Sequence, residues 1–326
     1  MSEDFLKRTI GVDVGLDWTN YALVDIRGTI LARDRFKTFE CPEMESCVSS
    51  LCEHRIVFME NNGGYELVRS VGISAPNANF KTGAIEYAPN LPWKGEVPLA
   101  AMVRDRLGLA CAIGNDAHTM ALCEKVYGSA RGLKDFIVVS IGKKGIGSCF
   151  YSHGVPHIGA EGFAGEFGHT CVVENGRECG CGKKGCLETY GSEYGCLMTA
   201  KELLEQSDEP SALRNSSTLT LDVLKTCAEQ GDPIAKEAFR KTAEVLGIAL
   251  ANYATIVDPE AIILTESMSH VGDVLMEPLR ETFERYVFHN IKNKVRIEVS
   301  VLTDAERDVL GASALAWDVK EYSLFT

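Results

Sequence analysis

Short apolar segments separated by glycine-containing turns open the chain. Residues 9–15, 20–25 and 29–37 are expected to form three strands joined by short turns, which predicts an antiparallel meander. A second meander is expected over residues 135–158, where three apolar segments again follow one another closely. Because the same pattern occurs twice, the sequence predicts two related halves.

Helical periodicity dominates elsewhere. The clearest helix begins at Asp232-Pro233, an N-cap residue followed by proline at the first helical position. Its apolar side chains recur with helical spacing, at Ala235, Phe239, Ala243, Leu246, Leu250 and Tyr253. Further elements are expected as helices near 43–62, 97–108, 117–128, 271–286 and 308–320, and as strands over 68–74, 110–114, 261–264 and 295–302. Strands that alternate with helices indicate an α/β protein.

Two segments lack a regular pattern. Residues 75–93 are rich in proline and asparagine and are expected to form a loop. Residues 207–218 combine serine, proline and charged side chains, which favours a mobile surface loop.

The bulk composition is typical of a globular protein with two domains. The chain has 326 residues, of which 45% are hydrophobic and 24% charged. Its net charge of −13 argues against sequence-independent binding to nucleic acid or to an anionic membrane. The N-terminus lacks the apolar core of a signal peptide, and no apolar run is long enough to span a bilayer. We therefore expect a cytoplasmic protein.

Cysteine is abundant, with 12 residues. A chain of this length does not need a disulfide scaffold, so we expect a reducing compartment. Eight of the cysteines are then expected to be small buried or half-buried thiols: Cys41, Cys47, Cys52, Cys111, Cys123, Cys149, Cys196 and Cys227.

A compact Cys/His cluster is the strongest chemical signal in the chain. His169, Cys179, Cys181 and Cys186 supply one imidazole and three thiolates, the four ligands of a closed, structural zinc site. The alternative is that four unrelated reduced residues happen to lie close together. Cys171 is a further possible ligand, less well placed because it is only two residues from His169.

Glycines lie between these cysteines, at Gly180, Gly182 and Gly185. Tight chelating turns need positive φ angles, which glycine tolerates. We therefore expect this conformation in the loop.

Polar residues that suit a sugar substrate lie in two places. Asn115-Asp116 follows a predicted strand, where a carboxylate can accept the proton of an attacking hydroxyl; the alternative is a simple helix cap. Glu166, His169 and Glu188 can form hydrogen bonds to vicinal hydroxyls of a sugar. The alternative is that both glutamates are solvated loop residues. One nitrogen of His169 can bind zinc while the other donates or accepts a hydrogen bond.

Two turns are candidates for binding phosphate. Asp13 ends the first strand before Gly15, where a carboxylate could organise Mg²⁺ at nucleotide phosphates, or could merely serve the turn. The turn Gly142-Lys143-Lys144-Gly145-Ile146-Gly147 is basic and glycine-rich, so its N–H groups could cradle phosphate. Glycine is also common in ordinary hairpins.

These motifs resemble those of the ROK family (repressor, open reading frame, kinase), and within it the glucokinase-like sugar kinases. The matching blocks are 164–192, which carries the Cys/His motif, together with 85–99, 113–132, 258–264 and 310–317. The resemblance implies an actin-like ATPase fold with two α/β domains around a cleft. It implies a small domain of residues 1–115 plus 305–326, and a large one of residues 116–304 with the zinc loop 165–188.

The resemblance also implies roles for individual residues. Asp116 would be the catalytic base on the sugar 6-hydroxyl. The sugar would contact Asn90, Asn115, Asp116, Glu166, His169 and Glu188. Zinc would bind His169, Cys179, Cys181 and Cys186 and hold the sugar loop in shape. ATP and Mg²⁺ would lie by Asp13, Gly15, Gly142, Lys143, Gly145 and Gly147.

The chain departs from the family pattern on the nucleotide side. Where the family has D-x-G-G-T, this chain has Leu16 and Asp17 in place of the second glycine and the threonine. The Gly142–Gly147 turn is longer by one residue, and Thr265-Glu266-Ser267 replaces a Gly-Gly pair. ATP then either binds in a rearranged way, with Lys143 and Lys144 offsetting Asp17, or binds weakly.

Two functions follow from the resemblance. The first is an ATP-dependent hexose kinase of glucokinase type. The second is a non-catalytic sugar sensor with a degraded nucleotide site and no DNA-binding domain, because only eight residues precede the first predicted strand. The resemblance further implies a homodimer or homotetramer. A purely structural role is less favoured, since it leaves the polar sugar-type residues unexplained.

Overall fold

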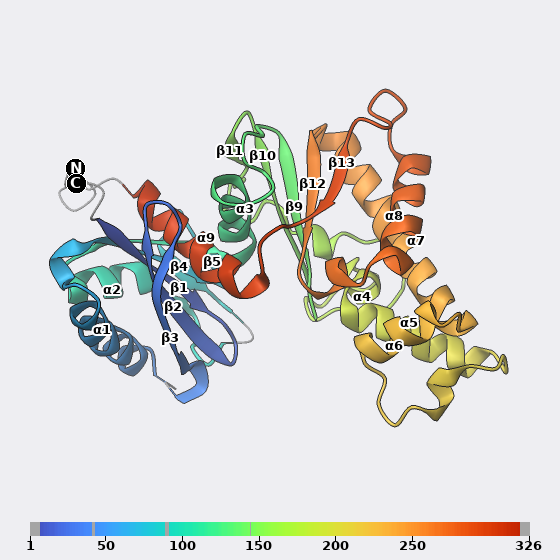
Figure 1. Cartoon of the computed structure of the whole chain (residues 1–326), viewed down its shortest axis with the longest axis horizontal. Coiled ribbons are helices and arrows are strands. Elements are labelled where there is room, and N and C mark those ends of the chain that lie inside the picture. Colours follow the sequence, from blue (N-terminus) through green and yellow to red (C-terminus); the bar gives the residue numbers. More distant parts are fainter. Residues whose placement is uncertain (1–6, 41–42, 89–90, 144, 320–326) are drawn as a thin grey trace. The chain divides into compact units, whose positions relative to one another are not determined.

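The computed structural model describes residues 7–40, 43–88, 91–143 and 145–319 (Figure 1). The chain forms two compact units. Unit 1 comprises residues 1–131, 158–163 and 301–326, and unit 2 comprises residues 132–157 and 164–300.

Each unit is built on a five-stranded sheet, and the two sheets have the same plan. The strand order is β3-β2-β1-β4-β8 in unit 1 and β11-β10-β9-β12-β13 in unit 2. In both, an antiparallel meander continues into two parallel strands. The predicted pair of related halves is therefore confirmed, and so is the α/β class.

Helices cover both faces of the unit 1 sheet. The elements are β1 (Arg8–Val14), β2 (Trp18–Asp25), β3 (Ile30–Lys37), β4 (Val68–Ala75), β8 (Ala110–Asn115), α1 (Met44–Asn61), α2 (Leu99–Leu107), α3 (Asp116–Val126) and α9 (Asp304–Asp318). Apolar side chains of α1 and α2 share one core with β1 and β4, and α9 packs on the sheet with α3 beside it. The α9 backbone lies so close that a Cβ on Gly11 would overlap the Val309 carbonyl oxygen.

A buried ion pair joins α9 to α3. The Arg307 guanidinium is 1% exposed and lies 3.1 Å from the Glu124 carboxylate, which is 0% exposed. Arg307 also donates to Asp304 and to the carbonyl of Leu302, each at 2.6 Å. This network satisfies a charge that would otherwise be costly to bury.

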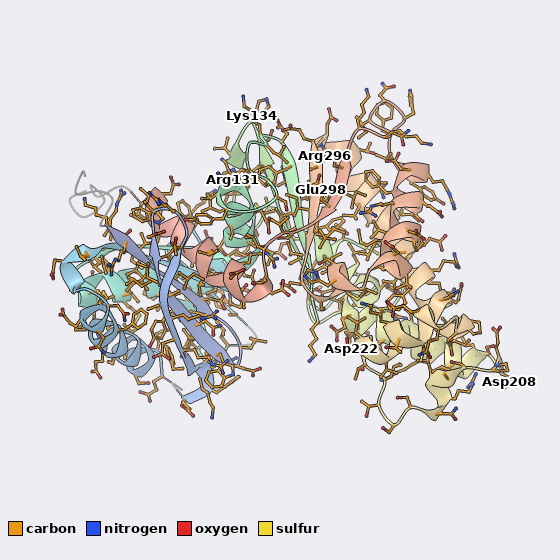
Figure 2. All side chains as sticks on the ribbon, in the orientation of Figure 1. Arg131, Lys134, Asp208, Asp222, Arg296 and Glu298 are labelled. Atoms are coloured by element: carbon orange, nitrogen blue, oxygen red, sulfur yellow. The ribbon has the colours of Figure 1, made fainter. Side chains whose placement is uncertain are left out.

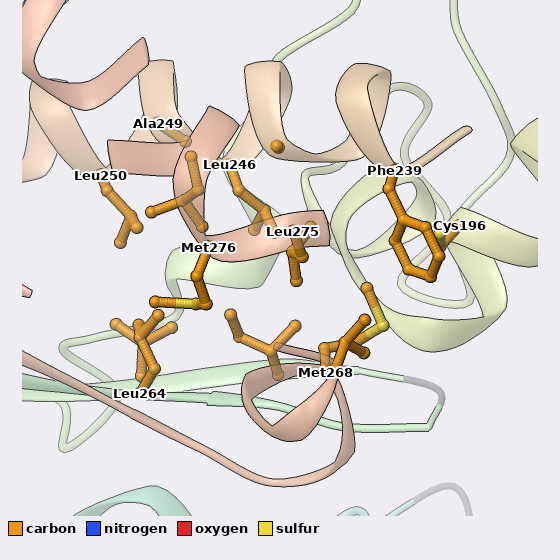
Figure 3. Close-up of a cluster of buried hydrophobic side chains, with 14 of the residues drawn as sticks. Cys196, Phe239, Leu246, Ala249, Leu250, Leu264, Met268, Leu275 and Met276 are labelled. Carbon is orange, nitrogen blue, oxygen red and sulfur yellow. The ribbon is translucent and has the colours of Figure 1, made fainter. Parts of the chain in front are cut away.

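Unit 2 places its helices over a sheet whose central strand is completely buried. The elements are β9 (Phe136–Ile141), β10 (Ile146–Ser152), β11 (Val155–Pro156), β12 (Ala261–Thr265), β13 (Arg296–Val299), α4 (Glu188–Gly191), α5 (Glu193–Gln206), α6 (Leu221–Glu229), α7 (Pro233–Val257) and α8 (Asp273–Tyr286). Figure 3 shows Leu246 and Leu250 of α7 in a cluster with Leu264 of β12 and Met276 of α8.

The longest helix begins where its sequence predicts. The Asp232 side chain accepts a hydrogen bond from the Ala235 N–H at 3.0 Å, and Pro233 is the first helical residue. The same carboxylate accepts from Ser211 and from the N–H of Ala212, and Leu213 is buried. The prediction of a mobile loop over residues 207–218 is therefore wrong at 211–213, because Asp232 anchors that part of the segment.

Other differences from expectation are local. The 75–93 segment contains strands β5 (Ala78–Asn79) and β6 (Ala84–Glu86), which form a small sheet with β7 (Glu96–Val97). Helix α9 begins at Asp304, earlier than predicted, and the Thr303 hydroxyl donates to the Glu306 carboxylate at 2.7 Å. The T-x-x-E spacing is that of a capping box, but the Thr303 side chain accepts no hydrogen bond from the first turn of α9.

The predicted domain division differs from the compact units. The predicted boundary after residue 115 separates α3 from β8, whereas α3 lies with unit 1 because it packs against α9. Residues 301–304 also cluster with unit 1.

The cysteine expectation holds for the described side chains. Cys52, Cys123, Cys149, Cys196 and Cys227 are buried and Cys111 is half-buried, all as free thiols. Cys41 and the side chain of Cys47 lie outside the described residues. Across the described parts of the chain, every helix is too short or too polar to span a bilayer.

Candidate functional site

The predicted metal ligands converge in unit 2. The ligand atoms of His169, Cys179, Cys181 and Cys186 all lie within 4.8 Å of one another. Cys179 Sγ is 3.6 Å from His169 Nδ1, and Cys181 Sγ is 3.7 Å from Cys186 Sγ. Residues from three separate turns of the loop therefore surround one point.

This geometry fits a tetrahedral zinc ion. Zn–S bonds of about 2.3 Å and Zn–N bonds of about 2.0 Å give tetrahedral edges of about 3.8 Å between sulfurs and about 3.5 Å between sulfur and nitrogen. Two of the separations between ligand atoms, 3.7 Å for Cys181 to Cys186 and 3.6 Å for Cys179 to His169, match those edges, and all of them are within 4.8 Å. Nδ1 of His169 is the nitrogen that lies beside the Cys179 sulfur. Three thiols and one imidazole are also a donor set that zinc prefers over Mg²⁺ or Ca²⁺.

The protein environment shifts the pKa values of the cluster thiols in different directions. The backbone N–H of Lys183 lowers the pKa of Cys181, whereas burial raises the pKa of Cys179 and of Cys186. Cys179 Sγ donates a hydrogen bond to Glu188 Oε1 at 2.9 Å. A bound divalent cation would replace these protons, because only thiolates ligate it.

The loop backbone has two of the three expected glycine conformations. Gly182 and Gly185 have φ angles of 87° and 76°. A Cβ on Gly185 would also overlap the carbonyl oxygen of Val173. The prediction for Gly180 is wrong, because the loop reverses at the other two positions. Cys171 is exposed and does not belong to the cluster.

Both predicted carboxylates lie beside the imidazole. Glu188 Oε1 is 3.6 Å from His169 Nδ1, and Glu166 Oε2 is 3.7 Å from His169 Nε2. Glu188 is the first residue of α4, and Glu166 precedes a short 3-10 helix, Phe167–His169. With Nδ1 on a metal, Nε2 and the Glu166 carboxylate would point away from it as a donor–acceptor pair.

The glycine-rich turn between β9 and β10 adjoins this loop. A Cβ on Gly145 would lie 3.5 Å from Glu188 Oε2, so the carboxylate beside the metal ligands also borders the turn. The N–H groups of Glu193 and Tyr194, at the start of α5, donate to the carbonyls of Gly142 and Lys143 at 3.1 and 3.0 Å. The metal loop and the turn thus form one continuous surface of unit 2.

Gly147 lies within β10 and not at the tip of the turn. It pairs with Ser140 of β9, and its N–H donates to the Ser140 hydroxyl at 3.2 Å. Gly142 closes the turn by donating to the carbonyl of Gly145 at 3.0 Å.

In unit 1, Asn115 and Asp116 have different positions at the start of α3. Asn115 is the N-cap, and its side chain accepts from the Ala117 N–H at 2.9 Å. Asp116 is the exposed first helical residue, and its carboxylate accepts from the same N–H at 2.8 Å. Since Asn115 already caps the helix, capping alone does not explain the carboxylate at 116.

Asp13 and Gly15 lie at the β1–β2 turn of unit 1. The Asn20 amide donates to Asp13 Oδ2 at 3.4 Å. Gly15 donates to the Trp18 carbonyl at 3.0 Å, the same pattern as in the β9–β10 turn. The side chain of Asp17 is exposed, as is that of Leu16 at 38%.

Sequence reasoning missed a cavity of 540 Å³ in unit 2. Leu197, Leu219, Leu221 and Val271 form an apolar part of its wall. Its polar part consists of Lys143, Glu193, Thr220, Asp222, Lys225, Ser267 and His270; Asp222 is labelled in Figure 2. The cavity is large enough for a small ligand and begins at the predicted phosphate turn. Lys143 and Ser267 belong to motifs singled out in the sequence, whereas the other residues meet only through the fold.

A second missed residue is Asp308 of α9. It lines a cavity of 420 Å³ in unit 1 together with Asn20, Arg33 and Arg35. Burial raises the pKa of Asp308 to about 6; the carboxylates of Asp304 and Asp116 also raise it, and Arg307 opposes the shift. Asp308 and Asp116 are therefore close enough for their charges to interact.

The predicted residues thus form two groups. Glu166, His169, Glu188, the cysteines and the β9–β10 turn meet in unit 2, whereas Asp13, Gly15, Asn115 and Asp116 belong to unit 1. Asn90 and Lys144 lie outside the described residues.

Comparisons with known proteins agree with this architecture. Residues 9–319 match the ROK family. A glucokinase from Streptomyces coelicolor is 30% identical over 316 residues, covering 94% of this chain and 97% of the relative. A xylose repressor from Caldicellulosiruptor bescii is 31% identical over 312 residues, covering 94% of this chain and 77% of the relative.

A solved structure is similar throughout. The ROK family glucokinase from Streptomyces griseus, in complex with glucose and AMPPNP, has a TM-score of 0.76 and 30% identity and covers 96% of this chain and 100% of its own.

The chain has the actin-like ATPase fold of sugar kinases, as its sequence predicts. It belongs to the ROK family, which confirms the resemblance seen in its motifs. Relatives named as kinases and relatives named as repressors match it almost equally well.

Proposed function

We propose that this protein is an ATP-dependent hexose kinase of glucokinase type, which phosphorylates the 6-hydroxyl of its sugar. The relatives named glucokinase favour this class, and the Streptomyces griseus enzyme was crystallised with glucose and an ATP analogue. Within this proposal, Asn90, Asn115, Glu166, His169 and Glu188 bind the sugar.

One observation carries the proposal. In unit 2, Glu188 lies 3.6 Å from His169 and also borders Gly145 of the glycine-rich turn. Sugar-type hydrogen-bonding groups and a phosphate-type turn are thereby continuous. A sugar hydroxyl held by the first and a phosphoryl group held by the second would be neighbours, which is the proximity that phosphoryl transfer requires.

The reaction would be an in-line displacement. The sugar 6-hydroxyl oxygen forms a bond to the γ-phosphorus, the bond from that phosphorus to the β,γ-bridging oxygen breaks, and ADP leaves with the electron pair. Asp116 accepts the hydroxyl proton as general base. Asp13 would hold a Mg²⁺ ion that arrives with the nucleotide, and this ion would supply charge neutralisation at the phosphates. Gly15, Gly142, Lys143 and Gly145 bind the phosphates, whereas Gly147 supports the turn from its place in β10.

The zinc ion has a structural task in this proposal. His169, Cys179, Cys181 and Cys186 would hold it with four protein groups, which would leave no position for substrate. With Nδ1 held in this way, His169 would present Nε2, together with Glu166, to sugar hydroxyls.

A second candidate is a non-catalytic sugar sensor. The similarity to xylose repressors favours it, as do the carboxylates of Asp17 and Glu266 in or beside the two predicted phosphate turns. A sensor would bind hexose through the same unit 2 loop but would not turn over nucleotide.

An ADP-release assay with glucose and Mg·ATP tests the proposal. We expect Asp116→Asn to lower kcat by about 100- to 10,000-fold, because the general base is lost. Asp273→Asn is the matched control, since Asp273 is also an exposed first residue of a helix and lies in α8. Equal rates for wild type and Asp116→Asn would remove Asp116 from its role, and no ADP release with any hexose would favour the sensor.

A further inference from the structure

Glu266 has a backbone conformation that residues other than glycine rarely adopt. Its φ and ψ angles are 67° and −172°, directly after β12 ends at Thr265. This region of backbone space is open almost only to glycine. The Glu266 carbonyl is held in place because both the N–H and the hydroxyl of Ser269 donate to it, at 3.0 and 2.7 Å.

This conformation directs the Glu266 carboxylate onto the β9–β10 turn. A Cβ on Gly142 would overlap Glu266 Oε2, so the carboxylate lies against the open face of that glycine. Gly142 is the residue that closes the turn by donating to Gly145. Because glycine lets a backbone approach a phosphate closely, the carboxylate occupies the face that a phosphate group would approach.

The neighbouring cavity supplies a second, independent observation. The hydroxyl of Ser267, the next residue, is buried, and among the described residues it has no hydrogen-bond partner. It lines the 540 Å³ cavity together with Lys143 of the turn. A buried hydroxyl without a partner is unfavourable in the empty protein and would be satisfied by a polar ligand in the cavity.

We infer that Glu266 determines how the protein accepts its phosphate donor. Its carboxylate occupies the phosphate-binding face of the β9–β10 turn. A nucleoside triphosphate therefore binds only by displacing that carboxylate. The inference rests on the proposed function, since it takes the turn to be the donor site. Glu266 thus weakens donor binding and leaves the sugar site untouched.

A packing role alone does not account for this residue. Glycine would reach the same backbone angles without strain, and the carbonyl would still accept from Ser269. What the glutamate adds is the carboxylate on Gly142. Like charge repels phosphate, so the expected consequence is a high KM for Mg·ATP with little change in kcat.

Calorimetry with hexose-saturated protein tests the inference. Mg·AMPPNP is titrated into wild type, Glu266→Gly and Glu266→Gln. We expect Glu266→Gly to bind at least about tenfold more tightly, because both the charge and the side chain are removed. Glu266→Gln keeps the shape without the charge and should gain about threefold. Hexose affinity should stay within twofold in every variant.

Asp258→Gly is the matched control. Asp258 is another non-glycine residue of unit 2 with a positive φ, 52°, at the end of α7. Its replacement relieves backbone strain away from the turn and should leave AMPPNP affinity unchanged.

The outcomes separate the inference from the proposed function. Equal AMPPNP affinity in wild type and both Glu266 variants, absence of binding in all of them, or an equal gain in Asp258→Gly would overturn the inference. If wild type consumes Mg·ATP but Glu266→Gly does not bind AMPPNP more tightly, the kinase proposal stands and the role of Glu266 is rejected. A gain in AMPPNP binding without turnover in any variant would support Glu266 as the determinant and exclude the kinase. With turnover, the KM for Mg·ATP should fall with the dissociation constant while kcat changes less than about threefold.

Discussion

The β1–β2 turn of unit 1 and the β9–β10 turn of unit 2 have the same hydrogen-bond pattern but differ in where their carboxylates lie. Both are built on a glycine that donates to a carbonyl three residues later, Gly15 to Trp18 and Gly142 to Gly145, each at 3.0 Å. In the β1–β2 turn the added carboxylate is Asp17, whose side chain is exposed. In the β9–β10 turn the carboxylates of Glu188 and Glu266 lie against the turn itself.

The difference shows that position decides what an added charge does. An exposed carboxylate is screened by water and salt and can rotate away from a ligand. The Glu266 carboxylate lies directly against Gly142, so a phosphate group approaching that glycine would have to displace it. The two units also differ in what holds their sites together, a buried ion pair in unit 1 and a metal-ligand cluster in unit 2.

The largest expected effect comes from removing one of the proposed metal ligands in unit 2. Cys181→Ser removes one thiolate of the cluster, so the loop loses zinc and with it the fixed His169–Glu166 pair. We expect about one zinc ion per chain in wild type and almost none in the variant, by elemental analysis. Hexose affinity should fall by more than about 100-fold.

Two controls sharpen this test. Cys171→Ser removes an exposed thiol of the same loop that is outside the cluster, and it should keep both zinc and hexose binding. The three tryptophans, Trp18, Trp93 and Trp317, all lie in unit 1, so tryptophan emission reports that unit. Its unfolding midpoint should stay unchanged in Cys181→Ser. Full zinc content in that variant would contradict the proposed ligand set.

The ion pair of unit 1 should have the next largest effect. Arg307→Ala leaves the Glu124 carboxylate buried without its guanidinium, which should lower the free energy of unfolding by about 3–5 kcal/mol. Urea unfolding followed by tryptophan emission measures this. The double variant Arg307→Met, Glu124→Leu should recover most of the loss, because both charges are then removed. A loss below about 1 kcal/mol in Arg307→Ala would contradict the account.

Asp308 should give a smaller, pH-dependent effect in unit 1. Burial raises its pKa from 3.8 to about 6, so the folded protein favours the protonated carboxyl. The stability that this group contributes is complete below its ordinary pKa and is lost as the pH rises through about 6. Asp308→Asn should therefore raise the free energy of unfolding at pH 7 by about 1–2 kcal/mol and by almost nothing at pH 3. A gain that does not depend on pH would refute this explanation.

The smallest expected effect concerns the exposed charge at the β1–β2 turn. Asp17→Thr removes a carboxylate that water already screens, so Mg·AMPPNP should bind only about two- to threefold more tightly, and the gain should vanish at 1 M salt. Calorimetry at low and high salt measures this. If Asp17→Thr increased Mg·AMPPNP affinity as much as Glu266→Gly does, the proposed difference between the two turns would be wrong.

Local sequence patterns predict much of this molecule. The two meanders, the Asp232-Pro233 helix start and the metal-ligand cluster depend on neighbouring residues or on ligand chemistry. The start of α9 at Asp304 was missed, although Thr303 and Glu306 have the T-x-x-E spacing of a helix start.

What remained hidden depends on long-range contacts. The parallel pairing of β9 with β12 joins Phe136 to Ala261, and only this pairing brings Glu266 to Gly142. Nothing near Asp308 in the sequence indicates that it interacts with Asp116. Gly180 differs from its neighbours because two glycines suffice to reverse the loop.

The most direct test is calorimetry on zinc-loaded wild-type protein, first with glucose and other hexoses and then with Mg·ATP. The account predicts that a hexose binds with measurable heat and that Mg·ATP then binds weakly and is consumed. Nucleotide binding in a protein that takes up no hexose would contradict it, because the metal-held loop of unit 2 would then not be a sugar site.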